Sequence, residues 1–192
     1  MARRSDHSRE ELKELAICKA IEIIDKNGFS GFSARGIAKA MGYTVGTLYH
    51  VFGDIDQYIL HINGRILDEW HQELSTGLKR TKKDPLLYLA QSYVDFARKN
   101  YNRWTTLFEF RMSNPTPLPD WYKEKMTRLF ALVESAILPH SDNNRRQSRL
   151  DAKVLWAGIH GICVLSLSGK LDIVGAEKTE VLVNSLLKKY VA

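Results

Sequence analysis

The segment from Phe32 to Val51 constrains the fold most, because it contains two short helical patterns separated by a glycine. Ser33 is a suitable N-cap for the first helix. Three apolar residues then fall on one face of that helix: Ile37, Ala38 and Met41. Gly42 can end the helix in the left-handed conformation without a Cβ clash, and we expect Thr44 to cap the second helix and Gly53 to end it. This pattern predicts a helix-turn-helix unit whose second helix is too short to be stable alone.

The second short helix has an apolar side and a polar side. We expect its buried residues to come from Val45, Leu48, Tyr49 and Phe52, and its outward residues to be Gly46, Thr47 and His50. No Asp or Glu occurs from Lys26 to Gly53, whereas Arg35 and Lys39 lie on or beside the first helix. An acid-free surface suits a phosphate backbone, and three side chains can donate hydrogen bonds to bases or phosphates: Thr47, Tyr49 and His50. The alternative is a solvated pair of helices in an ordinary bundle.

These residues resemble the N-terminal DNA-binding signature of the TetR family of transcriptional regulators. The matching features are Gly28-Phe29 at the end of a first helix, the run from Ser33 to Ala38, Gly42, and the run from Gly46 to Phe52. The resemblance implies a homodimer that binds a palindromic operator in double-stranded DNA and responds to a small-molecule ligand. It implies these DNA-binding residues: Ser33, Arg35, Thr44, Val45, Gly46, Thr47, Tyr49 and His50.

One position departs from the family pattern. Family members usually carry a lysine close after the phenylalanine that ends the second short helix, where it contacts a phosphate, and Ile55 stands there in this chain. Asp54 can instead cap the next helix, with Gln57 three residues later as in a capping box. We therefore expect the helix to form, and non-specific DNA affinity to be weaker or to be compensated by Arg3 and Arg4.

The remainder of the chain is predicted to be helical. Ser8 and Glu11 form a capping-box pattern at the start of a helix that ends near Lys26. Further helices are expected at residues 54–83, 86–100, 104–112, 121–138, 150–171 and 176–190, with a proline-rich loop at 113–119. We expect an all-α protein of about nine helices. Residues 1–53 are expected to form a helix-turn-helix DNA-binding domain, and residues 54–192 a helical bundle for ligand sensing and dimerisation.

The segment from Leu150 to Leu171 is almost continuously apolar and contains several small residues. A helix that is apolar on most sides must be covered on most sides. We therefore expect a two-fold homodimer formed by this helix and the last one, with an internal helix of a monomeric bundle as the alternative. Trp156 and His160-Gly161 also resemble a TetR subgroup that carries a Trp…His-Gly pattern in its C-terminal domain.

Aromatic residues are frequent in the C-terminal two thirds of the chain, where they usually form core. The family resemblance implies an inducer cavity in this region, apolar with a few polar groups. The candidate ligand-binding residues are Tyr93, Trp104, Phe108, Met112, Trp121, Trp156 and His160. For His160, the alternative is a hydrogen bond inside the core.

Composition narrows the function classes. Hydrophobic residues make up 44% and charged residues 26% of the chain, which excludes a disordered protein. The net charge of +6 suits a polyanion, but also suits a membrane surface or an acidic protein. No apolar run reaches the length of a membrane helix, so no membrane partner is expected. Cys18 and Cys163 lie among apolar residues, which predicts buried thiols, and the N-terminus lacks a signal-peptide core, which predicts a cytoplasmic protein.

An enzyme is the rival class. The best catalytic or metal-binding candidates are His61, Asp68 and His71, but seven- and ten-residue separations on one helix span two to three turns. No cofactor, metal ion or catalytic residue is therefore expected. A helical carrier of lipids or small molecules without DNA binding is the other alternative. The sequence thus predicts a ligand-responsive DNA-binding transcriptional regulator, expected to be a repressor released from its operator by a small molecule.

Overall fold

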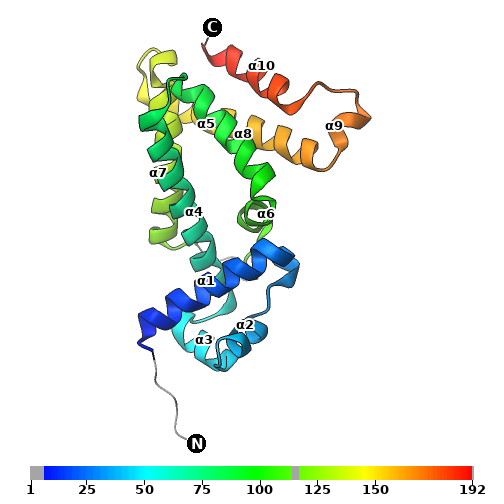
Figure 1. The fold of residues 1–192 in the computed structure, drawn as a ribbon. Coiled ribbons are helices and arrows are strands. Elements are labelled where there is room, and N and C mark those ends of the chain that lie inside the picture. Colours follow the sequence, from blue (N-terminus) through cyan, green and yellow to red (C-terminus); the bar gives the residue numbers. More distant parts are fainter. Residues whose placement is uncertain (1–6, 114–116, 192) are drawn as a thin grey trace, which may run out of the picture. The chain divides into compact units, whose positions relative to one another are not determined.

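The structure, a computed structural model, describes residues 7–113 and 117–191 (Figure 1). Within these residues the chain forms ten α-helices, two short 3₁₀ helices and no strand, which confirms the all-α prediction. Arg3 and Arg4, and part of the predicted loop at 113–119, lie outside the described residues. The helices are α1 Arg9–Asn27, η1 Phe29–Gly31, α2 Ala34–Ala40, α3 Val45–Phe52, α4 Ile55–Arg80, α5 Pro85–Lys99, α6 Tyr101–Glu109, α7 Asp120–Ile137, η2 Leu138–His140, α8 Arg145–Leu167, α9 Lys170–Ile173 and α10 Thr179–Val191.

The chain divides into two compact units. The first, called the N-terminal unit here, comprises Met1–Asp68 and Asn100–Tyr122, and the second, the C-terminal unit, comprises Glu69–Lys99 and Lys123–Ala192. The N-terminal unit therefore holds α1, α2, α3 and α6, and the C-terminal unit holds α5, α8, α9 and α10. The helices α4 and α7 contribute residues to both units.

Side-chain caps and one glycine define the helix-turn-helix. The predicted capping box at α1 is confirmed, because Ser8 Oγ accepts from Glu11 N and Glu11 Oε2 accepts from Ser8 N. Ser33 Oγ accepts from Gly36 N at 3.2 Å and caps α2. Gly42, at φ 78°, follows the end of α2, and this positive φ is why a glycine is required there.

The predicted cap at Thr44 is wrong in one respect. Thr44 is the N-cap residue of α3, but its side chain accepts no hydrogen bond from the helix backbone. Its hydroxyl oxygen instead lies 3.3 Å from Thr47 Oγ1. The hydroxyl-to-hydroxyl contact replaces the backbone cap that residue type alone had indicated.

The core of the N-terminal unit forms where α3 meets α1 and α4. Leu48, Val51 and Phe52 of α3 are buried, and the Phe52 ring stacks on Tyr58 with centroids 4.3 Å apart. Tyr58 is 1% exposed, and its hydroxyl donates to Ala16 O at 2.7 Å. Asp54 Oδ1 accepts from Gln57 N at 2.7 Å, which confirms the predicted cap at the start of α4.

The helix α6 is attached to the C-terminal end of α1. Arg103 forms two parallel bonds to the Asp25 carboxylate, Nε to Oδ1 and Nη2 to Oδ2, each 2.7 Å long. Asn102 Nδ2 donates to Asp25 O at 3.0 Å. A paired guanidinium–carboxylate contact fixes orientation as well as distance. The N-terminal turn of α6 is therefore held at a defined position against α1.

In the C-terminal unit, α8 and α10 lie side by side and antiparallel, and α9 connects them (Figure 1). Arg98 of α5 pairs with Glu180 of α10, and Ser166 Oγ lies 2.7 Å from Thr179 Oγ1. A Cβ at Gly158 would lie 2.7 Å from Leu186 Cδ2, so the glycine permits the close approach of the two helices.

Several predicted boundaries in this unit shift. The apolar segment forms α8 at 145–167 rather than 150–171, because Asn144 caps it and Gly169 adopts the left-handed conformation after it. The short α9 was not predicted, and α6 begins at Tyr101 rather than Trp104. Cys18 is exposed, contrary to expectation, whereas Cys163 is buried and burial raises the pKa of its thiol to about 11.

The helix α8 is also long and apolar enough to span a membrane, judged by length and composition alone, although no uninterrupted apolar run of the sequence had predicted this. Only 22% of its most apolar window is buried in the structure. An apolar helix that its own chain covers so little has a large surface left for another molecule.

The Tyr58 hydroxyl offers a test of the N-terminal core. We expect Tyr58→Phe to lower the free energy of unfolding by about 1 kcal/mol, because a buried hydrogen bond to Ala16 O is lost. For a chain of this size, that corresponds to a fall in melting temperature of about 2–4 °C. Thermal denaturation followed by circular dichroism measures it. Tyr101→Phe is the control, since Tyr101 is 48% exposed, and an equal shift in both variants would contradict a specific role for the bond.

Candidate nucleic-acid interface and ligand cavity

The exposed face of α3 contains Gly46, Tyr49 and His50, which lie three and four residues apart on one side of the helix. Tyr49 is 44% exposed, so the structure places it on the outer face rather than in the core. A Cβ at Gly46 would meet only Thr44 Oγ1, at 3.6 Å, so the surface there is open. This face offers a phenol, an imidazole and a flat approach at the glycine, which together suit contact with base edges and phosphates.

The other predicted DNA-binding residues surround this face. Val45 and Thr47 are half-buried, and Thr44 is exposed at the start of α3. On α2, Ser33 and Arg35 are exposed, as is Lys39. The structure therefore gathers the predicted residues on α2 and α3 within one helix-turn-helix.

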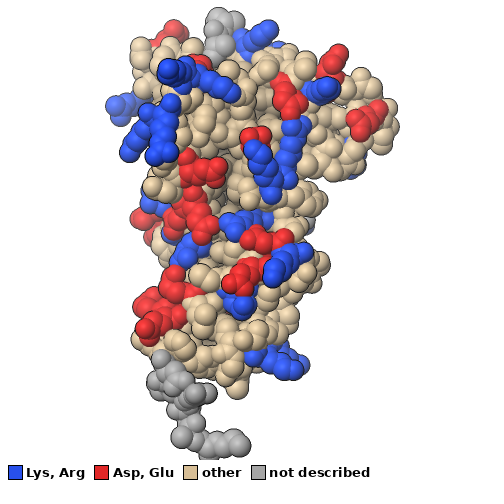
Figure 2. Space-filling view, viewed as in Figure 1, with Lys and Arg blue, Asp and Glu red and all other residues tan. Residues whose placement is uncertain are grey.

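The charge around α2 and α3 favours a polyanion. No acidic residue lies between Lys26 and Gly53, and on the side seen in Figure 2 the surface over α2 and α3 is tan and blue. Exposed acidic residues of this unit lie outside this stretch, as Glu10, Glu11 and Glu14 do on α1 and Asp54 does just after α3. Phosphates that approach α2 and α3 thus meet Arg35 and Lys39 without an acidic side chain from either helix.

Two contacts attach the N-terminal end of α1 to the helix-turn-helix, and no sequence pattern predicted them. His7 Nδ1 lies 2.8 Å from Tyr43 Oη, in the turn between α2 and α3. Arg9 Nη2 donates to Val51 O at 3.1 Å, near the end of α3. Periodicity reports which face of a helix is apolar but not which polar side chains meet across 36 or 42 residues of sequence.

A cavity of about 40 Å³ lies within the C-terminal unit, between α5, α7 and α8. Its lining residues are Leu86, Leu89, Ala90, Tyr93, Val133, Leu155, Trp156 and Ile159. Beside it, Tyr93 Oη lies 2.8 Å from His160 Nδ1, and the Trp156 and His160 rings stack with centroids 5.4 Å apart. Burial lowers the pKa of His160 below its ordinary value of 6.5, so the ring is neutral at pH 7.

Two family models match the chain. The model described as "Bacterial regulatory proteins, tetR family" matches residues 17–61, which include α2 and α3. The model described as "Tetracyclin repressor-like, C-terminal domain" matches residues 86–190, more than half of the chain. The chain belongs to the TetR family. It is therefore a ligand-responsive transcriptional regulator with a helix-turn-helix, and the family is one of regulatory DNA-binding proteins.

One curated relative and several solved structures are also similar to the chain. An uncharacterized HTH-type transcriptional regulator of Mycobacterium tuberculosis is 22% identical over 173 residues, which cover 90% of this chain and 76% of that protein. The structure of FadR from Bacillus subtilis with stearoyl-CoA matches at a TM-score of 0.62 and 17% identity, covering 93% of this chain and 97% of that one. The structure of RolR with resorcinol matches at a TM-score of 0.68 and 15% identity, covering 95% of this chain and 88% of that one. At these identities the structures establish a shared fold.

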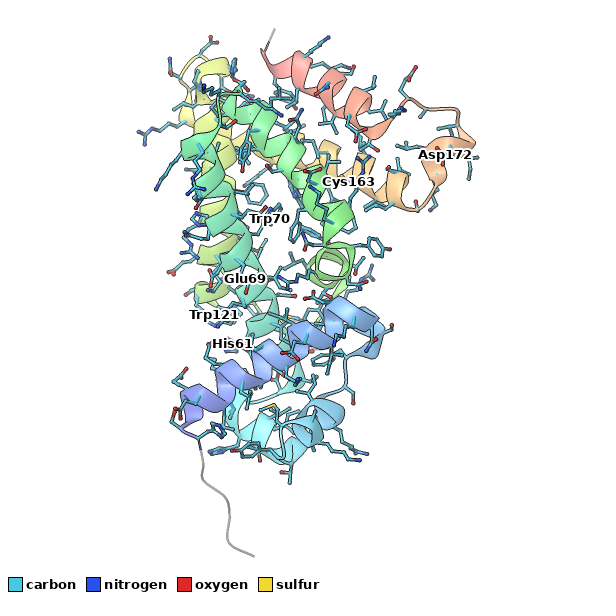
Figure 3. The ribbon with its side chains drawn as sticks, in the orientation of Figure 1. His61, Glu69, Trp70, Trp121, Cys163 and Asp172 are labelled. Carbon is cyan, nitrogen blue, oxygen red and sulfur yellow. The ribbon has the colours of Figure 1, made fainter. Side chains whose placement is uncertain are left out.

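The predicted ligand-binding residues of this TetR-family chain fall into two sets. Tyr93 and Trp156 line the cavity, and His160 adjoins it. His160 also forms an internal hydrogen bond to Tyr93, which is the alternative role expected for it. The other set lies in the N-terminal unit: Trp104, Phe108, Met112 and Trp121. Trp104 is 3% exposed, and Trp121 stacks on His61 with centroids 4.5 Å apart (Figure 3). A ligand-binding role for this second set stays a prediction, as does the Trp…His-Gly subgroup.

Most of the cavity wall is aliphatic, whereas the predicted ligand-binding residues are mainly aromatic, so the sequence prediction did not include most of these lining residues. Leu86, Leu89, Ala90 and Tyr93 are spaced as one apolar stripe of α5, and this spacing is the signal that could have identified them. In the described part of the chain, no group of three or more His, Cys, Asp or Glu side chains could hold a metal ion.

The open surface at Gly46 can be tested by adding an acidic side chain. We expect Gly46→Glu to fold normally, since a side chain there meets open space. It should weaken DNA binding at least about 100-fold, because a carboxylate facing phosphates costs several kcal/mol. Fluorescence anisotropy with labelled DNA measures the change. Ser135→Glu adds the same charge at an exposed position on α7, and equal losses in both variants would show an effect of net charge only.

Proposed function

We propose that this TetR-family chain is a homodimeric repressor that binds a palindromic DNA operator through α3 and is released by a small molecule. In this proposal, residues 1–53 bind DNA and residues 54–192 sense the ligand and dimerise. The observation that carries the proposal is the exposed face of α3, where Gly46, Tyr49 and His50 lie together on an acid-free surface. Such a regulator acts on DNA in the cytoplasm.

The residues of the face divide into two roles. Gly46 lets the helix approach the groove closely, while Tyr49 and His50 contact base edges or phosphates. Arg35 and Lys39, exposed on α2, are placed to neutralise phosphates. At Ile55 the family lysine is absent, and Asp54 uses its carboxylate to cap α4. Non-specific DNA binding should therefore depend less on salt than in a relative that carries this lysine, since fewer counterions are released.

The exposed apolar surface of α8 supports the homodimer. Leu150 and Val154 are 56% and 51% exposed, and the row continues along α8 through Ala157, Gly161 and Val164. These positions recur every three or four residues, so they form one stripe. A Cβ at Gly161 would meet nothing within 4 Å, so a partner helix has room to approach there. A second copy presents the same stripe, and a two-fold axis pairs the two.

A ligand can release the protein from its operator by changing the distance between the two recognition helices of the dimer. Two recognition helices must lie about 34–36 Å apart to enter successive major grooves on one side of a duplex. A ligand that moves the helices around its cavity changes this separation, and α4, which runs through residues of both units, is the element proposed to transmit the movement. By linkage, DNA weakens the ligand by the factor by which the ligand weakens DNA.

Selection of bound fragments from random DNA tests the function directly. We expect the purified protein to enrich a two-fold symmetric site. Tyr49→Ala and Thr47→Ala should each lose specific binding to that site, at about 1–3 kcal/mol for each base contact, and remain dimeric. Mobility-shift titrations measure the affinities. Failure to enrich any sequence, with a small molecule that co-purifies, would favour a helical carrier instead.

The stripe on α8 makes a separate prediction about assembly. We expect the wild-type protein to sediment as a dimer at micromolar concentration and Val154→Arg to sediment as a monomer, because two buried arginines would face each other across the axis. The Val154 side chain is 51% exposed, so the monomer should keep its helical content. Met126→Arg, on α7 and 37% exposed, is the matched control and should stay dimeric. A monomeric wild-type protein would end the two-fold argument.

A further inference from the structure

The cavity between α5, α7 and α8 has an uncharged wall. None of its eight lining residues is acidic or basic, and seven of them are aliphatic or carry the indole of Trp156. A carboxylate or an ammonium group placed there would lose its water without meeting an opposite charge from the wall. Such a loss costs far more than a hydrogen bond returns. The wall therefore selects against charged groups.

One polar pair adjoins this wall. Tyr93 is both a lining residue and the partner of His160, with Oη 2.8 Å from Nδ1. The ring of His160 is neutral, because burial lowers its pKa, so it offers a hydrogen bond and no charge. A ligand hydroxyl both donates and accepts, so it can bond to Tyr93 Oη or take its place at His160 Nδ1.

The lining residues differ in how deeply they are buried. Six lining residues are at most 6% exposed: Leu86, Leu89, Ala90, Tyr93, Leu155 and Ile159. Val133 and Trp156 are half-buried. The Trp156 ring contacts Phe130 edge to face, with centroids 5.6 Å apart. An aromatic side chain at the edge of the cavity can be replaced by an aromatic ligand with similar contacts.

The volume of the cavity decides whether a ligand fits without a change in the protein. The cavity measures about 40 Å³, whereas an apolar cavity that binds benzene in another protein measures about 150 Å³. A single ring therefore fits only if a side chain moves, and the half-buried Trp156 is the one whose movement frees a ring-sized space. Binding is thus coupled to a rearrangement on α8.

We propose that this cavity takes a small uncharged aromatic molecule with one hydroxyl group. The ring occupies the apolar space at Trp156, and the hydroxyl bonds to the Tyr93–His160 pair. The inference rests on the proposed function in using the same cavity as the inducer site, and it names the chemical class of the ligand.

Isothermal titration calorimetry with four probes of one ring each tests the class: phenol, toluene, benzoate and benzylammonium. We expect phenol and toluene to bind the wild-type dimer and the two ions to bind at least about tenfold more weakly, since a charge in the apolar wall is unpaired. Benzoate or benzylammonium that bind as tightly as phenol would overturn the proposal.

Tyr93→Phe separates the hydroxyl from the ring. We expect this variant to bind phenol about 3- to 10-fold more weakly, the loss of one neutral hydrogen bond, and to bind toluene as the wild type does. An unchanged affinity for phenol would show that the ligand hydroxyl makes no hydrogen bond to Tyr93, and would contradict the proposal.

Two variants test whether the neutral probes bind in this cavity. Ala90→Leu fills the space and should abolish binding of both neutral probes, whereas Val133→Ala enlarges it and should strengthen toluene binding. Ala131→Leu makes the matched change at an exposed position of α7 and should bind as the wild type does. Circular dichroism checks that each variant is folded. Unchanged toluene binding in both Ala90→Leu and Val133→Ala would overturn the site.

The inference and the proposed function fail differently. A protein that enriches a symmetric DNA site but binds none of the neutral probes leaves the regulator in place and overturns the ligand class. A protein that binds phenol in the expected manner but enriches no DNA supports the ligand class and overturns the repressor.

Discussion

The burial of one side of α3 is the constraint on which the proposed DNA-binding surface depends. A helix of eight residues is too short to be stable in water alone. Leu48, Val51 and Phe52 stabilise it by packing into the unit, and Phe52 stacks on Tyr58. Because these three residues take one side of the helix, Gly46, Tyr49 and His50 must lie on the other. The exposed face is thus a consequence of core packing.

The same unit fixes the orientation of this face by polar contacts at both ends of α1. Arg9 donates to Val51 O near the end of α3, and Asp25 holds Arg103 and Asn102 of α6. Partly exposed ion pairs of this kind add little to stability. Their value lies in geometry, because a recognition helix must enter the groove at a defined angle and separation. A change in α6 would reach α1 through the Asp25 contacts.

The sequence predicted the local features well, because caps and turns depend on residues close in the chain. Ser8 with Glu11, Ser33, Gly42 and Asp54 all act where expected. It failed where a choice depends on distant neighbours. Thr44 contacts Thr47 rather than the backbone, and Cys18 lies on the outer side of α1 although its neighbours are apolar. The cavity wall combines residues of α5, α7 and α8, and no local pattern shows that these stripes meet.

Two opposite sides of α8 are used: one side contributes to the cavity wall, and the other carries the exposed apolar stripe. Leu155 and Ile159 are buried toward the cavity, whereas Val154 is exposed and belongs to the stripe proposed to meet a second copy. A ligand that displaces Trp156 therefore acts on the helix that would set the position of the two protomers. Coupling of about 2 kcal/mol between the sites would change operator affinity about 30-fold. In the proposed dimer a small rearrangement on α8 would be enough for such a response, because two recognition helices must keep a defined separation to enter successive major grooves.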